Sequence, residues 1–185
     1  VQEIKETYGV DATAAGCDVS VEGDVVSMFD EVEKELGPVD ILVNNAALCP
    51  TCQVHEMSEK IWSDTIQTNL TGTFFTSKQL VKRLLDSERE GKIVNIVSQA
   101  AFRGSTTGHA PYDASKGGIV SFTIALAREV AQKGINVNAV APGMIRTEMV
   151  AKVLAANEEK YLSRIPLHRI ATPREVADVV VFLAS

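Results

Sequence analysis

Residues 39–46 have the sequence VDILVNNA, an uninterrupted apolar run that ends in polar residues. Two later segments share this pattern, KIVNIVS at residues 92–98 and INVNAVAPG at residues 135–143. Strands that are apolar throughout are typical of a parallel sheet whose two faces are both covered by helices. The carboxyl ends of such strands meet at one edge of the sheet, where ligands bind. We therefore expect a ligand site where these three segments end.

Helical segments alternate with these strands, which predicts an α/β fold with a doubly wound parallel sheet. Residues 12–19 (ATAAGCDV) form a further short strand candidate. Thr172, Pro173 and Glu175 carry the signals of a helix start: an N-cap, a proline at the first position and the glutamate of a capping box. No internal repeat or low-complexity linker interrupts the chain, so we expect one domain over residues 1–185. Helices are expected at the opening residues, at 24–37, 58–88 and 112–133, and twice more before the end.

The composition of the 185 residues excludes several classes of protein. A content of 45% hydrophobic and 23% charged residues is typical of a soluble globular domain. The formal charge of −6 argues against a nucleic-acid partner, because phosphates require clustered basic side chains. No apolar run approaches the roughly 18 residues that a membrane span needs. Three cysteines, an odd number, favour a reducing cytoplasm over a disulfide scaffold.

The pair Tyr112 and Lys116 lies in the stretch YDASK, with one helical turn between the two side chains. Taken alone, this spacing fits an ordinary surface helix as well as a proton donor beside a cation. Six motifs in order decide between these two interpretations. They are CDV, NNAA, TNLTGTF, IVNIVS, YDASK and VNAVAPGMIRT, and they extend from residue 17 to residue 147. With these motifs the chain resembles the short-chain dehydrogenase/reductase family.

This resemblance implies a Rossmann-like fold, NAD or NADP as cofactor, and interconversion of a carbonyl and a secondary alcohol. A 3-oxoacyl-carrier-protein reductase is the favoured activity, with a sugar or polyol dehydrogenase as the alternative. A different class of protein, a non-catalytic binding protein on a degenerate dehydrogenase fold, would be expected to lack one of the four catalytic residues.

The resemblance implies four catalytic residues, Asn69, Ser98, Tyr112 and Lys116. Tyr112 is the acid/base, and the Lys116 ammonium is expected to lower the phenol pKa while it holds the ribose hydroxyls of the cofactor. Ser98 is expected to hydrogen-bond the substrate oxygen, and Asn69 to anchor a water that relays protons to Lys116. Without the resemblance, Ser98 would be taken for a helix cap and Asn69 for a solvated helix residue.

The resemblance also implies the cofactor-binding residues. Asp18 and Val19 would lie near the adenine, although Asp18 can equally be a helix-entry cap. The strand-end residues and the loop near the nicotinamide carboxamide complete the set, although Pro142 and Gly143 also fit a plain turn. With Tyr112 and Lys116, the remaining members are Asn45, Ala46, Ala47, Pro142, Gly143, Ile145 and Thr147.

The chain departs from the family pattern in three ways. Ala47 stands where the family usually has glycine, which is tolerable if the local φ is negative. Ser98 and Tyr112 are fourteen residues apart where thirteen is usual, so the intervening loop has one extra residue. No GxxxGxG phosphate-binding loop and no closing strand occur in residues 1–185. We therefore expect an incomplete sheet and a fragment of a longer protein.

Cys49, Cys52 and His55 form a CxxCxxH arrangement directly after the NNAA motif. Such spacing can hold zinc or form a redox pair, but we favour free thiols in a substrate-side loop and expect no metal site.

The expected partner is a small carbonyl or alcohol substrate, possibly linked to a carrier protein, and no nucleic acid or membrane. Arg83, Arg128 and Lys133 could meet an acidic carrier, although scattered basic residues are usually a solvated face. By resemblance, the long helices starting near Ser58 and Tyr112 are expected to form a homo-tetramer or dimer.

Overall fold

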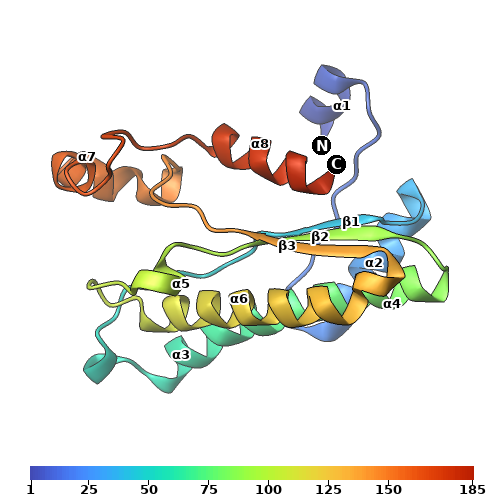
Figure 1. Cartoon of the computed structure of the whole chain (residues 1–185), viewed down its shortest axis with the longest axis horizontal. Helices are drawn as coiled ribbons and strands as arrows, with labels where there is room; N and C mark the ends of the chain where they lie inside the picture. Colours follow the sequence, from blue (N-terminus) through green and yellow to red (C-terminus); the bar gives the residue numbers. More distant parts are fainter.

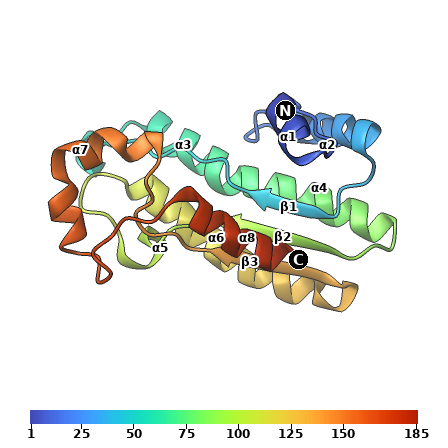
Figure 2. The ribbon, with the colours of Figure 1, turned by 90° about the horizontal axis from the view of Figure 1, so that it is seen from above.

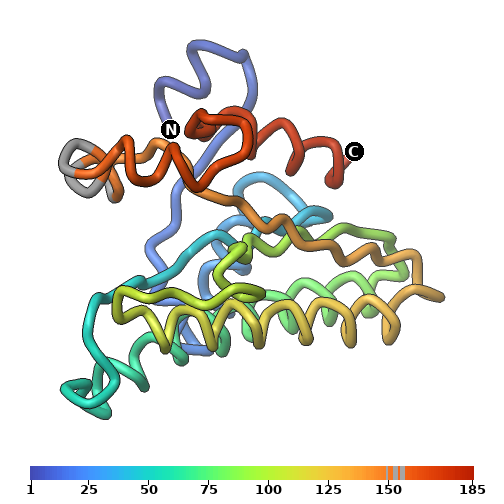
Figure 3. Tube along the Cα trace, turned by 60° about the vertical axis from the view of Figure 1, so that its left-hand side comes forward, coloured from blue at the N-terminus to red at the C-terminus, as the bar shows by residue number. Residues whose placement is uncertain are grey.

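The computed structural model describes the backbone of residues 1–185 and every side chain except those of residues 149, 152, 153, 155 and 156 (grey in Figure 3). Three parallel strands form one sheet in the order β1-β2-β3: β1 (Ile41–Asn44), β2 (Gly91–Ile96) and β3 (Ile135–Val140). Helices lie on both sides of this sheet (Figure 1). The predicted α/β class with a parallel sheet is confirmed.

The helices fall into two layers. Below the sheet in Figure 1 lie α2 (Glu22–Leu36), α3 (Glu59–Ile66), α4 (Gly72–Asp86) and α6 (Ala110–Val130). Above it lie α1 (Gln2–Tyr8), α7 (Glu148–Leu162) and α8 (Pro173–Ala184), and Figure 2 shows α8 over β2 and β3. The short α5 (Ala100–Arg103) follows β2, and brief 3₁₀ turns cover Val54–Glu56 and Ala131–Lys133. Within the described part of the chain, none of these helices has the length and hydropathy to cross a bilayer.

The main hydrophobic core lies between the sheet and the lower helices. Leu80 and Leu84 of α4 and Ile93 of β2 have no exposed surface, and α6 contributes Leu126 and Val130. Each fully buried aliphatic side chain of this kind stabilises the fold by about 1.5–3 kcal/mol. This layer therefore fixes α4 and α6 beneath the strands, so that α6 delivers its amino-terminal turns to the sheet edge.

Two of the expected elements differ in the structure. Residues 12–19 do not form a strand: no ladder joins them to β1, β2 or β3, and a strand is stable only when its main chain pairs with a neighbour. The predicted helix over 58–88 is not continuous α-helix, because a π-helical stretch, Gln67–Thr71, separates α3 from α4. The capping box at the start of α8 is confirmed. The Glu175 amide donates to Thr172 Oγ1 at 3.4 Å, and the Thr172 amide donates to Glu175 Oε2 at 2.9 Å.

The start of β2 generates a first testable prediction. A methyl group on Gly91 would lie 2.7 Å from the Asp40 carbonyl oxygen and would overlap Leu84, so the backbone would have to move. We expect Gly91→Ala to lower the free energy of unfolding by about 1–3 kcal/mol, measured by urea denaturation. Gly23 of α2 is the matched control, because its added methyl would meet nothing within 4 Å. Gly23→Ala is expected to be neutral or stabilising by up to about 1 kcal/mol, and equal losses in both variants would contradict the prediction.

Candidate functional site

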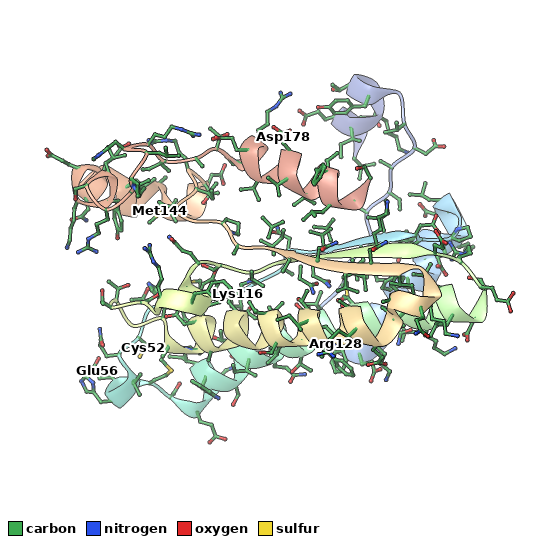
Figure 4. The ribbon with its side chains drawn as sticks, in the orientation of Figure 1. Cys52, Glu56, Lys116, Arg128, Met144 and Asp178 are labelled. Atoms are coloured by element: carbon green, nitrogen blue, oxygen red, sulfur yellow. The ribbon has the colours of Figure 1, made fainter. Side chains whose placement is uncertain are left out.

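The carboxyl ends of the three strands lie at one edge of the sheet, as the sequence predicts. The segments that follow β2 and β3 remain hydrogen-bonded to each other: the Gln99 amide donates to the Pro142 carbonyl oxygen at 3.1 Å. The Gln99 side chain lies against Gly143, where a Cβ would stand 3.5 Å from its amide nitrogen. Figure 4 shows Lys116 on the α6 side of this edge and Met144 on the α7 side. The candidate site is therefore built by the ends of β1, β2 and β3 and by the first turns of α6.

Lys116 crosses from α6 to the end of β2. Its Nζ donates to the Ile96 carbonyl oxygen at 2.7 Å and lies 5.6 Å from the centroid of the Tyr112 ring. The residue is only 3% exposed, and this burial lowers the pKa of the ammonium to about 8. The Cys49 thiol acts weakly in the opposite direction. The structure thus brings Tyr112 and Lys116 together on one helix face and places the cation at a strand end.

The pKa of Tyr112 is shifted in a direction opposite to the expected one. Burial raises it, the Ser98 side chain lowers it through a hydrogen bond, and the nearby Cys49 and Asp113 raise it further. Lys116 Nζ donates to the Ile96 carbonyl oxygen and lies 5.6 Å from the centroid of the Tyr112 ring. Burial is the largest influence on the phenol, so the expected lowering of its pKa by Lys116 stays a prediction, and Ser98 is the group that lowers it in this structure.

Ser98 lies two residues beyond β2 and combines the two interpretations that the sequence left open. Its Oγ accepts a hydrogen bond from the Ala100 amide at 3.1 Å, which shapes the turn into α5. The same side chain interacts with Tyr112 and lowers the pKa of its phenol. A hydroxyl can donate and accept at once, so Ser98 both shapes the local backbone and belongs to the Tyr112 site.

Asn69 lies in the π-helical stretch and has no exposed surface. Its Nδ2 donates to the Leu48 carbonyl oxygen at 2.9 Å and to Ser115 Oγ at 3.0 Å, and its Oδ1 accepts from the Leu48 amide at 2.7 Å. Both amide hydrogens are therefore bonded to protein groups rather than to solvent. Ser115 Oγ in turn donates to the Tyr112 carbonyl oxygen at 2.7 Å, so Asn69 reaches the site through the backbone of Tyr112.

A cavity of about 140 Å³ lies beside the end of β1. It brings together three of the expected cofactor residues, Val19, Asn45 and Ala46, although they come from two segments of the chain. Gly72 permits this approach, because a Cβ there would lie 2.9 Å from a methyl of Val19. The remaining lining residues are Met28, Leu42, Val43, Asn44, Thr68, Thr73 and Thr76.

Four other residues of the expected cofactor set have the following surroundings. The Asp18 carboxylate accepts from the Ser20 amide and hydroxyl, which lowers its pKa, and it shapes the turn before α2 as a cap would. Ala47 does not have a positive φ, so the condition for replacing glycine there is met. Ile145 pairs with Ala171 in an isolated parallel bridge. Thr147 directly precedes α7.

The residues present fit the nicotinamide–ribose part of the implied cofactor. Lys116 Nζ carries three N–H donors and uses one on the Ile96 carbonyl oxygen, which leaves two for ribose hydroxyls. The cavity beside Val19 and Asn45 offers an adjoining space. The glycine-rich loop that would hold the phosphates is not among residues 1–185.

The CxxCxxH residues do not converge in the structure. Cys49 Sγ lies 3.8 Å from His109 Nδ1, Cys52 Sγ lies 3.6 Å from the Gln53 carbonyl oxygen, and His55 is paired with Glu56. Over the side chains that the structure describes, no three His, Cys, Asp or Glu residues are grouped to hold a metal. Cys49 instead lies near Tyr112 and Lys116, and the substrate-side loop of free thiols stays a prediction.

Sequence reasoning missed one residue of the site, Ser115. A helical serine commonly donates to a carbonyl oxygen of the preceding turn, so the bond from Ser115 to the Tyr112 carbonyl oxygen could have been expected from the sequence. Its other partner, Asn69, lies 46 residues away, and no spacing in the sequence indicates that contact.

Comparisons with known proteins agree on the family. A family model described as enoyl-(acyl carrier protein) reductase matches residues 1–185. The 3-oxoacyl-[acyl-carrier-protein] reductase FabG of Aquifex aeolicus (strain VF5) is 38% identical over 184 residues, which are 100% of this chain and 73% of that protein. A putative ketoacyl reductase of Streptomyces coelicolor is 39% identical over 195 residues, with 99% of this chain and 74% of that protein covered.

Solved structures agree with these sequences. A variant of the actinorhodin polyketide ketoreductase, crystallised with NADPH, has a TM-score of 0.91 and 38% identity over 100% of this chain and 74% of its own. A short-chain type dehydrogenase/reductase from Mycobacterium marinum has a TM-score of 0.93 and 31% identity, with 100% and 72% covered. The names of these relatives specify different reactions, so their agreement is at the level of the family and of its ketoacyl-reductase branch. The chain therefore belongs to the short-chain dehydrogenase/reductase family of NAD(P)-dependent oxidoreductases and is similar to its 3-oxoacyl-acyl-carrier-protein reductases.

Proposed function

We propose that this protein reduces the carbonyl of a 3-oxoacyl group, linked as a thioester to a carrier, with NAD(P)H, and that Tyr112 supplies the proton. The observation that carries the proposal is the convergence of Tyr112, Ser98 and Lys116 at the carboxyl edge of the sheet. The names of the reductase relatives, at 38–39% identity, support the acyl-carrier substrate class.

The residues of the chain would divide the work as follows. The cofactor, when bound, supplies the hydride. Ser98 donates a hydrogen bond to the substrate oxygen on which negative charge develops, and Tyr112 transfers its phenolic proton to that oxygen. The two remaining N–H donors of Lys116 orient the ribose hydroxyls of the cofactor. Burial raises the pKa of Tyr112, so the phenol is protonated and ready to donate at neutral pH.

Two candidate activities remain as alternatives to this proposal. A sugar or polyol dehydrogenase would use the same three residues with a hydroxylated substrate, and comparison of a 3-oxoacyl thioester with a polyol in one assay separates them. A non-catalytic protein is disfavoured because Asn69, Ser98, Tyr112 and Lys116 are all present and lie at one edge of the fold. Binding of NADPH without turnover of either substrate would support that second alternative.

The carrier would have to meet a surface outside the site. Arg83 is not available for it, because its guanidinium is engaged by Glu33 at 3.0 Å, by Asp30 and by Gln79. Arg128 and Lys133 are exposed, and Arg128 lies far along α6 from Lys116 (Figure 4). Of the three basic residues considered from the sequence, only these two support contact with an acidic carrier.

A homo-oligomer formed through the long helices is part of this proposal. A surface groove of about 440 Å³ lies between α4 and α6, and its floor and walls are mainly apolar, with Phe74, Val81, Leu85 and Phe122 among them. Phe74 is 42% exposed and lies beside Phe122 in this groove, so the two form a contiguous apolar surface that a second copy could cover. A cytoplasmic location also stays a prediction, supported by three cysteines that are all free.

The acid/base role of Tyr112 is tested by Tyr112→Phe in the protein as its gene encodes it. We expect kcat for a 3-oxoacyl thioester to fall by a factor on the order of 10²–10⁴, because a positioned proton donor contributes that much. The KM for NADPH is expected to stay unchanged, since the phenol hydroxyl is removed and the ring remains. Tyr8→Phe in α1, at a tyrosine that is 74% exposed, is the control and is expected to be fully active. Unchanged turnover in Tyr112→Phe would refute the assignment.

The buried ammonium of Lys116 predicts a pH-dependent stability. Its pKa is about 8 in the folded chain against an ordinary value of 10.5, so the unfolded chain binds more protons between these pH values. The contribution of Lys116 to the free energy of unfolding therefore rises with pH from about 8 to 10.5, by roughly 3 kcal/mol in total, and it is most unfavourable below pH 8.

The measurement compares Lys116→Met with the unsubstituted protein by urea denaturation from pH 7 to pH 11. We expect the unsubstituted protein to gain stability relative to Lys116→Met as the pH rises. Lys60→Met is the control, because the Lys60 side chain is 82% exposed, and it should show no such relative gain. A constant difference between Lys116→Met and the unsubstituted protein across this range would contradict the burial argument.

A further inference from the structure

Ser115 is a buried hydroxyl whose hydrogen-bonding capacity is used in two directions. It has no exposed surface and lies between Tyr112 and Lys116 in α6. Its Oγ donates to the Tyr112 carbonyl oxygen at 2.7 Å and accepts from Asn69 Nδ2 at 3.0 Å. Back-bonding to a preceding carbonyl is common for a helical serine, but here the same oxygen also joins α6 to another element.

Asn69 is itself held in one orientation. Its carboxamide bonds both the amide and the carbonyl of Leu48, at 2.7 and 2.9 Å, so the plane and the direction of the amide are fixed. Only the second Nδ2 hydrogen is left, and it points to Ser115. Leu48 directly follows residues 45–47, which end β1 and are expected to contact the cofactor.

These bonds form one continuous chain. It leads from the Leu48 peptide through the Asn69 amide and the Ser115 hydroxyl to the Tyr112 carbonyl oxygen. Asn69 and Ser115 are fully buried, and a buried network of this kind is rigid when every member has a partner. Among the side chains that the structure describes, no buried polar atom lacks one.

We propose that Ser115 is a positioning residue for catalysis: its hydroxyl ties the backbone of Tyr112 to Asn69 and thereby holds the phenol in place relative to Ser98 and residues 45–47. This inference rests on the proposed role of Tyr112 as proton donor. Ser115 does not touch the substrate; it acts through the position of Tyr112.

Thr123 offers a matched site that separates positioning from plain stability. It lies two turns further along α6 and is 6% exposed. Its Oγ1 donates to the Ile119 carbonyl oxygen at 2.7 Å and accepts from Asn95 Nδ2 at 2.9 Å. The two hydroxyls therefore make the same pair of bonds, but the Thr123 pair lies at Asn95 of β2 and not at Tyr112.

The Tyr112 phenol can report the change directly, because its pKa depends on its neighbours. Burial raises this pKa, Ser98 lowers it through the hydrogen bond, and Cys49 and Asp113 raise it. Lys116 Nζ lies 5.6 Å from the centroid of the Tyr112 ring, and His109 Nδ1 lies 3.8 Å from the Cys49 Sγ. If the ring moves away from Ser98, the effect that lowers the pKa is weakened and the pKa of Tyr112 rises further.

The experiment compares Ser115→Ala and Thr123→Val, each of which removes one hydroxyl and leaves no large cavity. Both variants are expected to lower the urea midpoint. Only Ser115→Ala is expected to shift the titration of Tyr112 to higher pH, measured by NMR of proteins with ¹³Cζ-labelled tyrosine and assigned with Tyr112→Phe. It should also lower kcat by on the order of ten- to a hundredfold at unchanged KM for NADPH, because small displacements of a reacting group are costly.

An unchanged Tyr112 titration in Ser115→Ala, or an equal shift in Thr123→Val, would overturn the proposal. This readout needs no turnover, so it tests Ser115 even if Tyr112→Phe shows that Tyr112 is not the proton donor. If Ser115→Ala does not fold, Ser115→Cys keeps the bulk and weakens both hydrogen bonds. A Tyr112 titration unchanged in that variant would likewise overturn the proposal.

Discussion

A hydrogen bond from a buried ammonium group joins α6 to the carboxyl edge of the sheet. Lys116 is 3% exposed, and among the described side chains and backbone its Nζ has one acceptor, the carbonyl oxygen of Ile96 at the end of β2. A charged amine with so few partners is unfavourable in a low-dielectric environment, and the pKa of about 8 is the direct result. The hydrophobic layer under the sheet stabilises this arrangement, because Leu126 and Val130 anchor the far end of the same helix. Two donors are thereby kept at a strand end, available for hydroxyl groups.

Two buried asparagines link the strand ends to α6 by side-chain hydrogen bonds. Asn95, the last but one residue of β2, accepts from Asn44 of β1 and donates to Thr123, which fixes the middle of α6 against the strand ends. Asn69 does the same at the site end, between Leu48 and Ser115. An apolar core tolerates small shifts of a helix along its axis, whereas a directional bond of about 2.9 Å does not. Packing therefore sets the distance between α6 and the sheet, and these amide hydrogen bonds set the position of α6 along the strands.

Much of this arrangement could be predicted from local patterns. The run VDILVNNA and its two counterparts predict a parallel sheet with a polar edge, because periodicity and strand ends are local properties. The expected roles of Tyr112, Lys116 and Ser98 come from the resemblance to a known family, because their spacing alone fits an ordinary helix and a helix cap. The strand expected at residues 12–19 could not be judged in this way, since a strand depends on a neighbour for its hydrogen bonds. The π-helical turn at Asn69 and the partner of Ser115 depend on contacts between distant segments, which no spacing expresses.

The opposite pKa shifts of Tyr112 and Lys116 have one physical origin. Both groups are buried, and burial favours the neutral form of each, so the phenol keeps its proton more firmly and the ammonium holds its proton less firmly. The cation is bonded to a backbone carbonyl and lies over the ring, and Ser98 favours the phenolate. A substrate oxygen that gains negative charge beside Ser98 and Tyr112 would meet two hydroxyl donors rather than a cation. If Tyr112 is the proton donor as proposed, burial thus keeps it in the protonated form that this step requires.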